Sequence, residues 1–182
     1  MSIFKKTSYL IFSIFLLSCS QTLDFEQIND YEVAPVFSVA LVSFALEAEA
    51  LDTFIGISSA NEIEELTEFR VFENSFIRDN LTQLGFNFEL VNQFNRDFNL
   101  QITLLDDDDN TIHEFQELNI VANNIDFKQE EIITIQQNPN IINVTQVLLS
   151  VRLGNTSLPI DNLDSGFLEL KSAVTVHLET SI

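Results

Sequence analysis

An acidic run in the second half of the chain offers the densest set of potential metal ligands, Asp106-Asp107-Asp108-Asp109-Asn110. Calcium binds several carboxylate and amide oxygens, which calcium-binding loops supply at alternate positions and from an acid at the end of the loop. The run, together with two acids that follow it, matches these positions in part. The predicted ligands are Asp106, Asp108, Asn110, Glu114 and Glu117.

Two positions in this pattern argue against a calcium site. Thr111 stands where the sharp turn of a calcium loop requires glycine, and His113 stands where an apolar residue is usual. The alternative is a polar hairpin turn, whose Asp and Asn residues suit the backbone geometry of a turn. We expect the turn, with calcium as the only cofactor that the sequence suggests.

Histidines and the usual catalytic motifs give little support for an enzyme. His113 and His177 are the two histidines, and each is expected on a solvated strand face; for His177, alternation places it beside Thr175 and Glu179. No Ser-His-Asp order, phosphate-binding glycine loop or metalloprotease motif is present. We therefore expect a protein without catalytic residues, and a small hydrolase is the least favoured alternative.

The beginning of the chain has the pattern of an export signal. Lys5 and Lys6 precede an apolar run over residues 9–17, which is well short of the roughly 20 residues that a membrane-spanning helix needs. The run ends in Leu16-Leu17-Ser18-Cys19. These four residues resemble the lipobox of bacterial lipoproteins. The resemblance implies that residues 1–18 are removed and that Cys19 carries the lipid.

The cysteine count agrees with this interpretation. Cys19 is the only cysteine, so an intramolecular disulfide bond is impossible. Ser20 follows it, whereas Asp at that place favours inner-membrane retention in enterobacterial lipoproteins, so Ser20 resembles an outer-membrane address. The Asn-, Ile- and Phe-rich, Gly-poor composition resembles that of Bacteroidota, especially flavobacterial, proteins. The implied partner of Cys19 is the lipid bilayer of the outer membrane, on either its periplasmic or its surface side.

The charge balance argues against nucleic acid as a partner. The chain has 28 Asp and Glu against 8 Lys and Arg, a formal charge of −20. Loss of the signal would remove two lysines and change this charge to −22. Such a chain would repel nucleic-acid phosphates, but its 46% hydrophobic residues are enough to build a folded core.

Period-two alternation of apolar residues predicts strands along most of the chain. A tether is expected over residues 19–34, and the strand that follows over 35–46 is apolar on both faces, which favours burial on both. The region 47–82 is ambiguous: a helix beginning after Asn61 and a strand over 69–77 both fit. The later strands are expected over 86–90, 98–104, 112–121, 132–135, 147–153 and 168–178.

Short strands separated by polar turns predict an all-β domain over residues 35–182, an antiparallel β-sandwich with an immunoglobulin-like arrangement and a short helix or irregular segment near 60–80. The 17 Phe residues fall mostly on apolar faces and there is no Trp, which disfavours a sugar-stacking platform. We expect a non-enzymatic outer-membrane lipoprotein that serves as a binding, adhesion or accessory subunit of an envelope complex. A carbohydrate- or calcium-binding module is the alternative.

Overall fold

The computed structural model describes residues 32–50, 62–154 and 166–181. Within this part, Val33–Thr180 forms one compact unit. The predicted signal segment, Cys19 and most of the predicted tether lie outside the described residues. The described helices are all short, and none is both long and apolar enough to cross a membrane.

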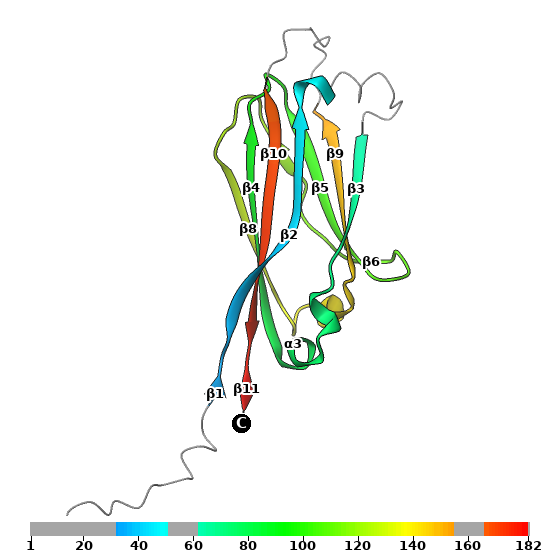
Figure 1. Cartoon of the computed structure of the whole chain (residues 1–182), viewed down its shortest axis with the longest axis vertical. Coiled ribbons are helices and arrows are strands. Elements are labelled where there is room, and N and C mark those ends of the chain that lie inside the picture. Colours follow the sequence, from blue (N-terminus) through cyan, green and yellow to red (C-terminus); the bar gives the residue numbers. More distant parts are fainter. Residues whose placement is uncertain (1–31, 51–61, 155–165, 182) are drawn as a thin grey trace, which may run out of the picture. The chain divides into compact units, whose positions relative to one another are not determined.

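Two antiparallel sheets pack face to face (Figure 1). The first contains, in order, β2 (Val36–Glu47), β10 (Phe167–Leu178), β4 (Leu81–Asn92) and β8 (Phe127–Thr134). The second contains β3 (Glu62–Glu68), β9 (Gln146–Leu153), β5 (Phe98–Leu105) and β6 (Thr111–Glu114), with β7 (Leu118–Ile120) also paired to β5. Two short strands, β1 (Glu32–Val33) and β11 (Thr180–Ser181), pair separately.

The strand pairs are nested along the chain. β2 pairs with β10, β3 with β9, β4 with β8 and β5 with β6. Further ladders join β10 to β4 and β9 to β5, which completes the two sheets. The predicted antiparallel β-sandwich is confirmed, and its strand order is that of a jelly roll rather than the immunoglobulin order. Alternation shows which residues form strands, but it does not show which strands become neighbours.

The core lies between the two sheets, on the faces that the period-two pattern predicts. Phe86, Phe88 and Leu90 of β4 are each at most 1% exposed, and burying a side chain of this size contributes about 1.5–3 kcal/mol. The largest fully buried side chains are Phe86, Phe88, Phe94, Phe98, Phe115, Leu84, Leu90, Leu100, Ile102, Leu104 and Leu118.

The short helix predicted near 60–80 is present between β2 and β4, but the helix and the strand occur in the reverse order to that expected. The segment expected as a helix after Asn61 is strand β3, because it pairs with β9 along its whole length. The segment expected as a strand instead contains η2 (Val71–Glu73) and α3 (Ser75–Asn80). The side chain of Asn74 caps α3 by accepting a hydrogen bond from the Phe76 amide at 3.0 Å. Strand pairing and this cap override the weak local preference of the sequence.

Three other predictions about strands are corrected. β2 is not buried on both faces, since it lies at the edge of its sheet and Val36 is 56% exposed. The run expected over 112–121 is divided into β6 and β7, and the short strand expected at 132–135 begins earlier, at Phe127. The predicted Asn138 turn contains the 3-10 helix η3 (Pro139–Asn143).

Candidate functional site

The acidic run forms the turn that joins β5 to β6. One carboxylate oxygen of Asp106, Oδ1, accepts hydrogen bonds from the backbone amides of Asp108 and Asn110, both at 2.9 Å. The side-chain amide of Asn110 donates to the same carboxylate at 3.2 and 3.1 Å. Asp109 has a φ of 60°, the left-handed conformation that Asp tolerates well. The predicted polar turn is confirmed.

These hydrogen bonds explain the chemistry of Asp106. The backbone amide of Asn110, then its side chain, and finally the Asp108 amide lower the pKa of Asp106 below its ordinary value of 3.8. Each donor favours the charged form of the carboxyl group. The carboxylate therefore already has partners within its own turn.

The other predicted calcium ligands lie elsewhere. Glu114 ends β6 opposite Thr103, and Glu117 forms an ion pair with Arg152, which also approaches Glu62 at 3.8 Å. Among the described residues, no three His, Cys, Asp or Glu side chains lie close enough together to hold a metal ion. Thus the fold brings Asp106, Asp108 and Asn110 together but does not bring Glu114 and Glu117 to them as a ligand set.

A groove runs beside this turn at one end of the sandwich. One hollow of about 540 Å³ is lined by Phe72, Arg78 and Asp107, and a neighbouring hollow of about 520 Å³ is lined by Arg70 and again Asp107. Thr145 borders both hollows, and its hydroxyl is buried without a hydrogen-bond partner. We call these two hollows the end groove.

Most charges in the end groove are already paired. Arg70 contacts Glu68 at 2.8 Å and Glu73 at 3.1 Å. The hydrogen bond with Glu68 and the opposite charge raise the pKa of Arg70, and the same contacts lower the pKa of Glu68. Arg78 donates to the Phe72 carbonyl at 2.9 Å. The groove has the size and polarity of a small-ligand site.

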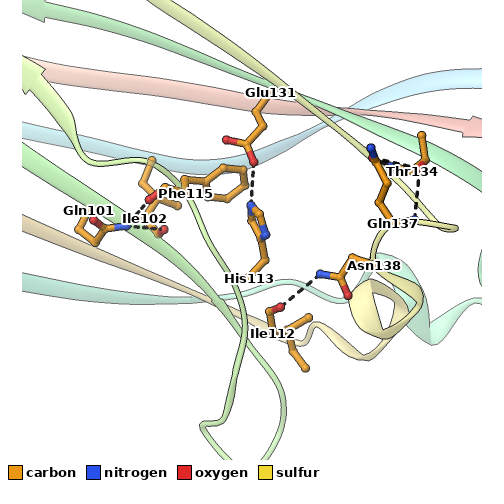
Figure 2. A network of polar contacts seen from close by, with 9 residues as sticks. All are labelled: Gln101, Ile102, Ile112, His113, Phe115, Glu131, Thr134, Gln137 and Asn138. Carbon is orange, nitrogen blue, oxygen red and sulfur yellow. Dashed lines mark hydrogen bonds and ion pairs between the residues drawn. The ribbon is translucent and has the colours of Figure 1, made fainter.

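A second polar cluster joins the two sheets where β6 faces β8 (Figure 2). The Nε2 atom of His113 lies 2.8 Å from a carboxylate oxygen of Glu131, and the Phe115 ring packs edge-on against the imidazole at 4.7 Å. The side-chain amide of Asn138 donates to the Ile112 carbonyl at 3.2 Å and holds η3 against β6. We call this the closed edge.

The location of His113 corrects the expectation of a solvated face. Its side chain is only 24% exposed, because its place in β6 is opposite Leu104, which faces the core. His177 lies on the outer face of the first sheet, in register with Gln83 and Val36. The contacts of His113 are with Glu131 and Phe115, so the arrangement is that of a clasp between sheets.

The four edge strands differ in their charge. β3 has four glutamates within its seven residues, β8 has Lys128, Glu130 and Glu131, and β6 is only four residues long. Charges and short length both protect an edge from pairing with another strand. β2 is 12 residues long and has no charge before Glu47.

A bulge interrupts the pairing of β2 with β10. Leu41 and Val42 both lie opposite Ser172, so the register shifts there. The Ser172 hydroxyl accepts from the Val42 amide at 3.0 Å and donates to the Val42 carbonyl at 2.6 Å. This explains a buried serine within an apolar face, a signal that could have indicated the bulge from the sequence.

Comparison with known proteins does not assign a family. No protein-family model and no curated protein matches the chain. Among solved structures, a predicted secreted protein from Parabacteroides distasonis aligns with a TM-score of 0.43 and 10% identity, covering 63% of this chain and 38% of that one.

Two viral proteins align at similar levels. A structure of infectious bursal disease virus (Gx strain) has a TM-score of 0.39 and 10% identity, covering 80% of this chain and 32% of the other. The bacteriophage CBA120 tailspike protein 4 has a TM-score of 0.42 and 10% identity, covering 81% and 19%. The chain thus spans less than two fifths of the length of any of these three proteins. Likenesses this distant carry no information on ligand, partner or activity.

Proposed function

We propose that this protein is a non-enzymatic, lipid-anchored subunit of the outer membrane that binds a protein partner through the free edge of β2. The observation that carries the proposal is the contrast among the edge strands. Val36 to Leu46 contains no charged residue in a chain of net charge −20. Exposed, uncharged strand edges present unpaired backbone groups and favour the addition of another strand.

The lipid anchor rests on the lipobox at Cys19. Each buried acyl methylene contributes about 0.8 kcal/mol, so two or more chains hold a protein stably on a membrane. Replacing Cys19→Ala should move the protein from the membrane fraction to the soluble fraction. Ser20→Ala, one residue away, is the matched control and should stay with the membrane. A Cys19→Ala protein that remains membrane-bound would contradict the anchor.

The partner can be sought by crosslinking in native outer membranes. A photo-crosslinking residue at Ala40 of β2 is compared with one at Glu130 of β8, since both are exposed and lie in one cross-strand row at opposite edges of the same sheet. A specific product from position 40 and none from 130 is expected. Equal products from both positions, or none from position 40, would count against partner binding through β2.

The end groove offers a second candidate function, binding of a small polar ligand such as a sugar or a calcium ion. The observation in its favour is the buried Thr145 hydroxyl, which has no partner and borders both hollows. A buried hydroxyl without a hydrogen bond is costly, and Asp107, which also lines both hollows, offers a ligand a carboxylate to contact. Calorimetric titration with calcium and with monosaccharides tests this, and Asp107→Asn should weaken any binding seen. No heat at millimolar ligand would exclude the candidate.

A further inference from the structure

In the described part of the chain, the inward face of β3 is not covered by a strand of the other sheet, at the edge opposite the closed edge. Glu65 pairs with Leu149 of β9, and Leu149 in turn pairs with Ile102 of β5. The side chains of Leu149 and Ile102 are both buried in the core. Glu65 therefore faces the space between the sheets, yet it is exposed. Ile63 and Thr67 share this face and are only half-buried.

The cause lies in how the two sheets overlap. Across the sandwich, β2 approaches β9 more closely than it approaches β3, and β9 is the inner neighbour of β3. The second sheet consequently extends one strand beyond the first. Among the described strands, none of the first sheet continues past β2 to cover β3. We call the free edge of β2 together with the inward face of β3 (Ile63, Glu65 and Thr67) the open edge.

The open edge determines the shape of the segment that fits it. A strand added beside β2 would hydrogen-bond to its free backbone groups and would lie over β3. Because side chains alternate along a strand, every second side chain of the added segment would face β3. Its inward positions would meet Ile63, Glu65 and Thr67 in turn, so apolar side chains flanking a central basic one are complementary.

Charge selects against other occupants. Glu64 lies next to Glu65 on β3, whereas Glu62 and Glu68 already contact Arg152 and Arg70. The charge of Glu64 and Glu65 would repel a negative segment. A second copy of this chain would contribute its own β2, which has no basic residue, and would bring another −20 of net charge. A basic partner is thus favoured over self-association.

We propose that an extended, basic segment of a partner protein adds to β2 as a further strand and places a Lys or Arg side chain against Glu65. This rests on the proposed function, because it names the chemistry of the partner that β2 binds. Affinity would come from backbone hydrogen bonds, and specificity from the charge at the central inward position.

A charge-swap binding experiment on the purified full-length chain tests the proposal. The probe is the labelled peptide Thr-Val-Thr-Lys-Thr-Val-Thr, which puts Val, Lys and Val on one face, and its matched partner has Glu in place of Lys. Fluorescence anisotropy should show the Lys peptide binding at least about tenfold more tightly. Glu65→Lys should reverse this preference. Leu66→Lys, the next residue on the opposite face of β3, should leave it unchanged.

Three outcomes would overturn the proposal. They are equal binding or no binding of the two peptides, a Leu66→Lys effect as large as that of Glu65→Lys, and photo-crosslinking from position 65 to this same chain or to a second copy. Circular dichroism of each variant verifies that the sandwich is folded. If the peptides fail while crosslinking at position 40 still captures a membrane protein, the proposed function survives and only the basic strand is rejected.

Discussion

The two edges of the sandwich differ in whether side chains of the two sheets contact each other there. At the closed edge, the His113–Glu131 contact joins β6 to β8, and Phe115, which is 2% exposed, packs against Phe86 and Phe88 of β4. At the open edge, β2 is uncharged up to Glu47 and β3 leaves Glu65 exposed on its inward face. Glu131 and Glu65 both occupy inward positions of edge strands, since each pairs with a buried residue. Only Glu131 has a partner from the other sheet.

This difference separates stability from recognition. Inward-pointing charges are one way in which natural sheets protect their edges. At the closed edge, the inward-pointing Glu131 also has a hydrogen-bond partner, His113. At the open edge the charge on β3 faces a place where a further strand fits. We expect substitutions at the closed edge to change the free energy of unfolding and substitutions at the open edge to change binding.

The largest effect on stability is expected from Phe115→Ala. The ring packs edge-on against Phe86, Phe88 and His113, with centroids 4.9, 5.1 and 4.7 Å away. Loss of a buried aromatic ring costs about 3–5 kcal/mol of unfolding free energy, measurable by urea denaturation. Phe76→Ala, at a ring that is 49% exposed, should cost less than about 0.5 kcal/mol. Similar losses in both variants would mean that Phe115 does not anchor the closed edge.

The clasp between sheets should make a smaller contribution. A double-mutant cycle of His113→Ala and Glu131→Ala should give a coupling energy of about 0.5–1.5 kcal/mol, the usual net value of one hydrogen bond. Replacing Glu130→Ala, the exposed neighbour on the outer face, should show no coupling to His113. A coupling energy of zero would mean that the His113–Glu131 contact does not stabilise the closed edge.

The turn that leads into β6 should make the free energy of unfolding depend on pH in the acidic range. Because its hydrogen bonds lower the pKa of Asp106 below 3.8, Asp106 stabilises the fold above that pH and loses this contribution as the pH falls through the lowered pKa. Asp106→Ala should therefore destabilise the protein at neutral pH by a smaller amount than Phe115→Ala. The difference in melting temperature between Asp106→Ala and the unsubstituted protein should shrink below pH 3.8. Thermal melts at several pH values, with Asp107→Ala as the control, measure it. A difference that stays constant with pH would contradict this role.

The smallest effect on stability is expected at the open edge. Glu65→Ala should change the unfolding free energy by no more than about 0.5 kcal/mol, as is usual for exposed positions. The matched change Glu131→Ala, also at an inward position but on the closed edge, should cost more. A large loss for Glu65→Ala would show that β3 depends on this side chain for folding and would remove the distinction between the edges.

Particular residues show how far the sequence was informative. Alternation at Phe86, Phe88 and Leu90 correctly predicted a strand with one buried face. The same alternation could not show that β4 lies between β10 and β8, because pairing partners are set by long-range packing. The acidic run was correctly predicted as a turn, since Asp and Asn satisfy a turn's backbone locally. Glu131 was missed because the strand that contains it was predicted to begin only at residue 132.

By itself, the sequence determined the composition, the acidic charge and the alternating strands, and it showed the resemblance to a lipobox at Cys19. Only the tertiary structure decided the jelly-roll order, the contact of His113 with Glu131, and the exposure of Glu65 on an inward face. Those features depend on which strands lie side by side and on where one sheet extends beyond the other. They arise from packing between residues far apart in the chain, and a one-dimensional pattern does not record that packing.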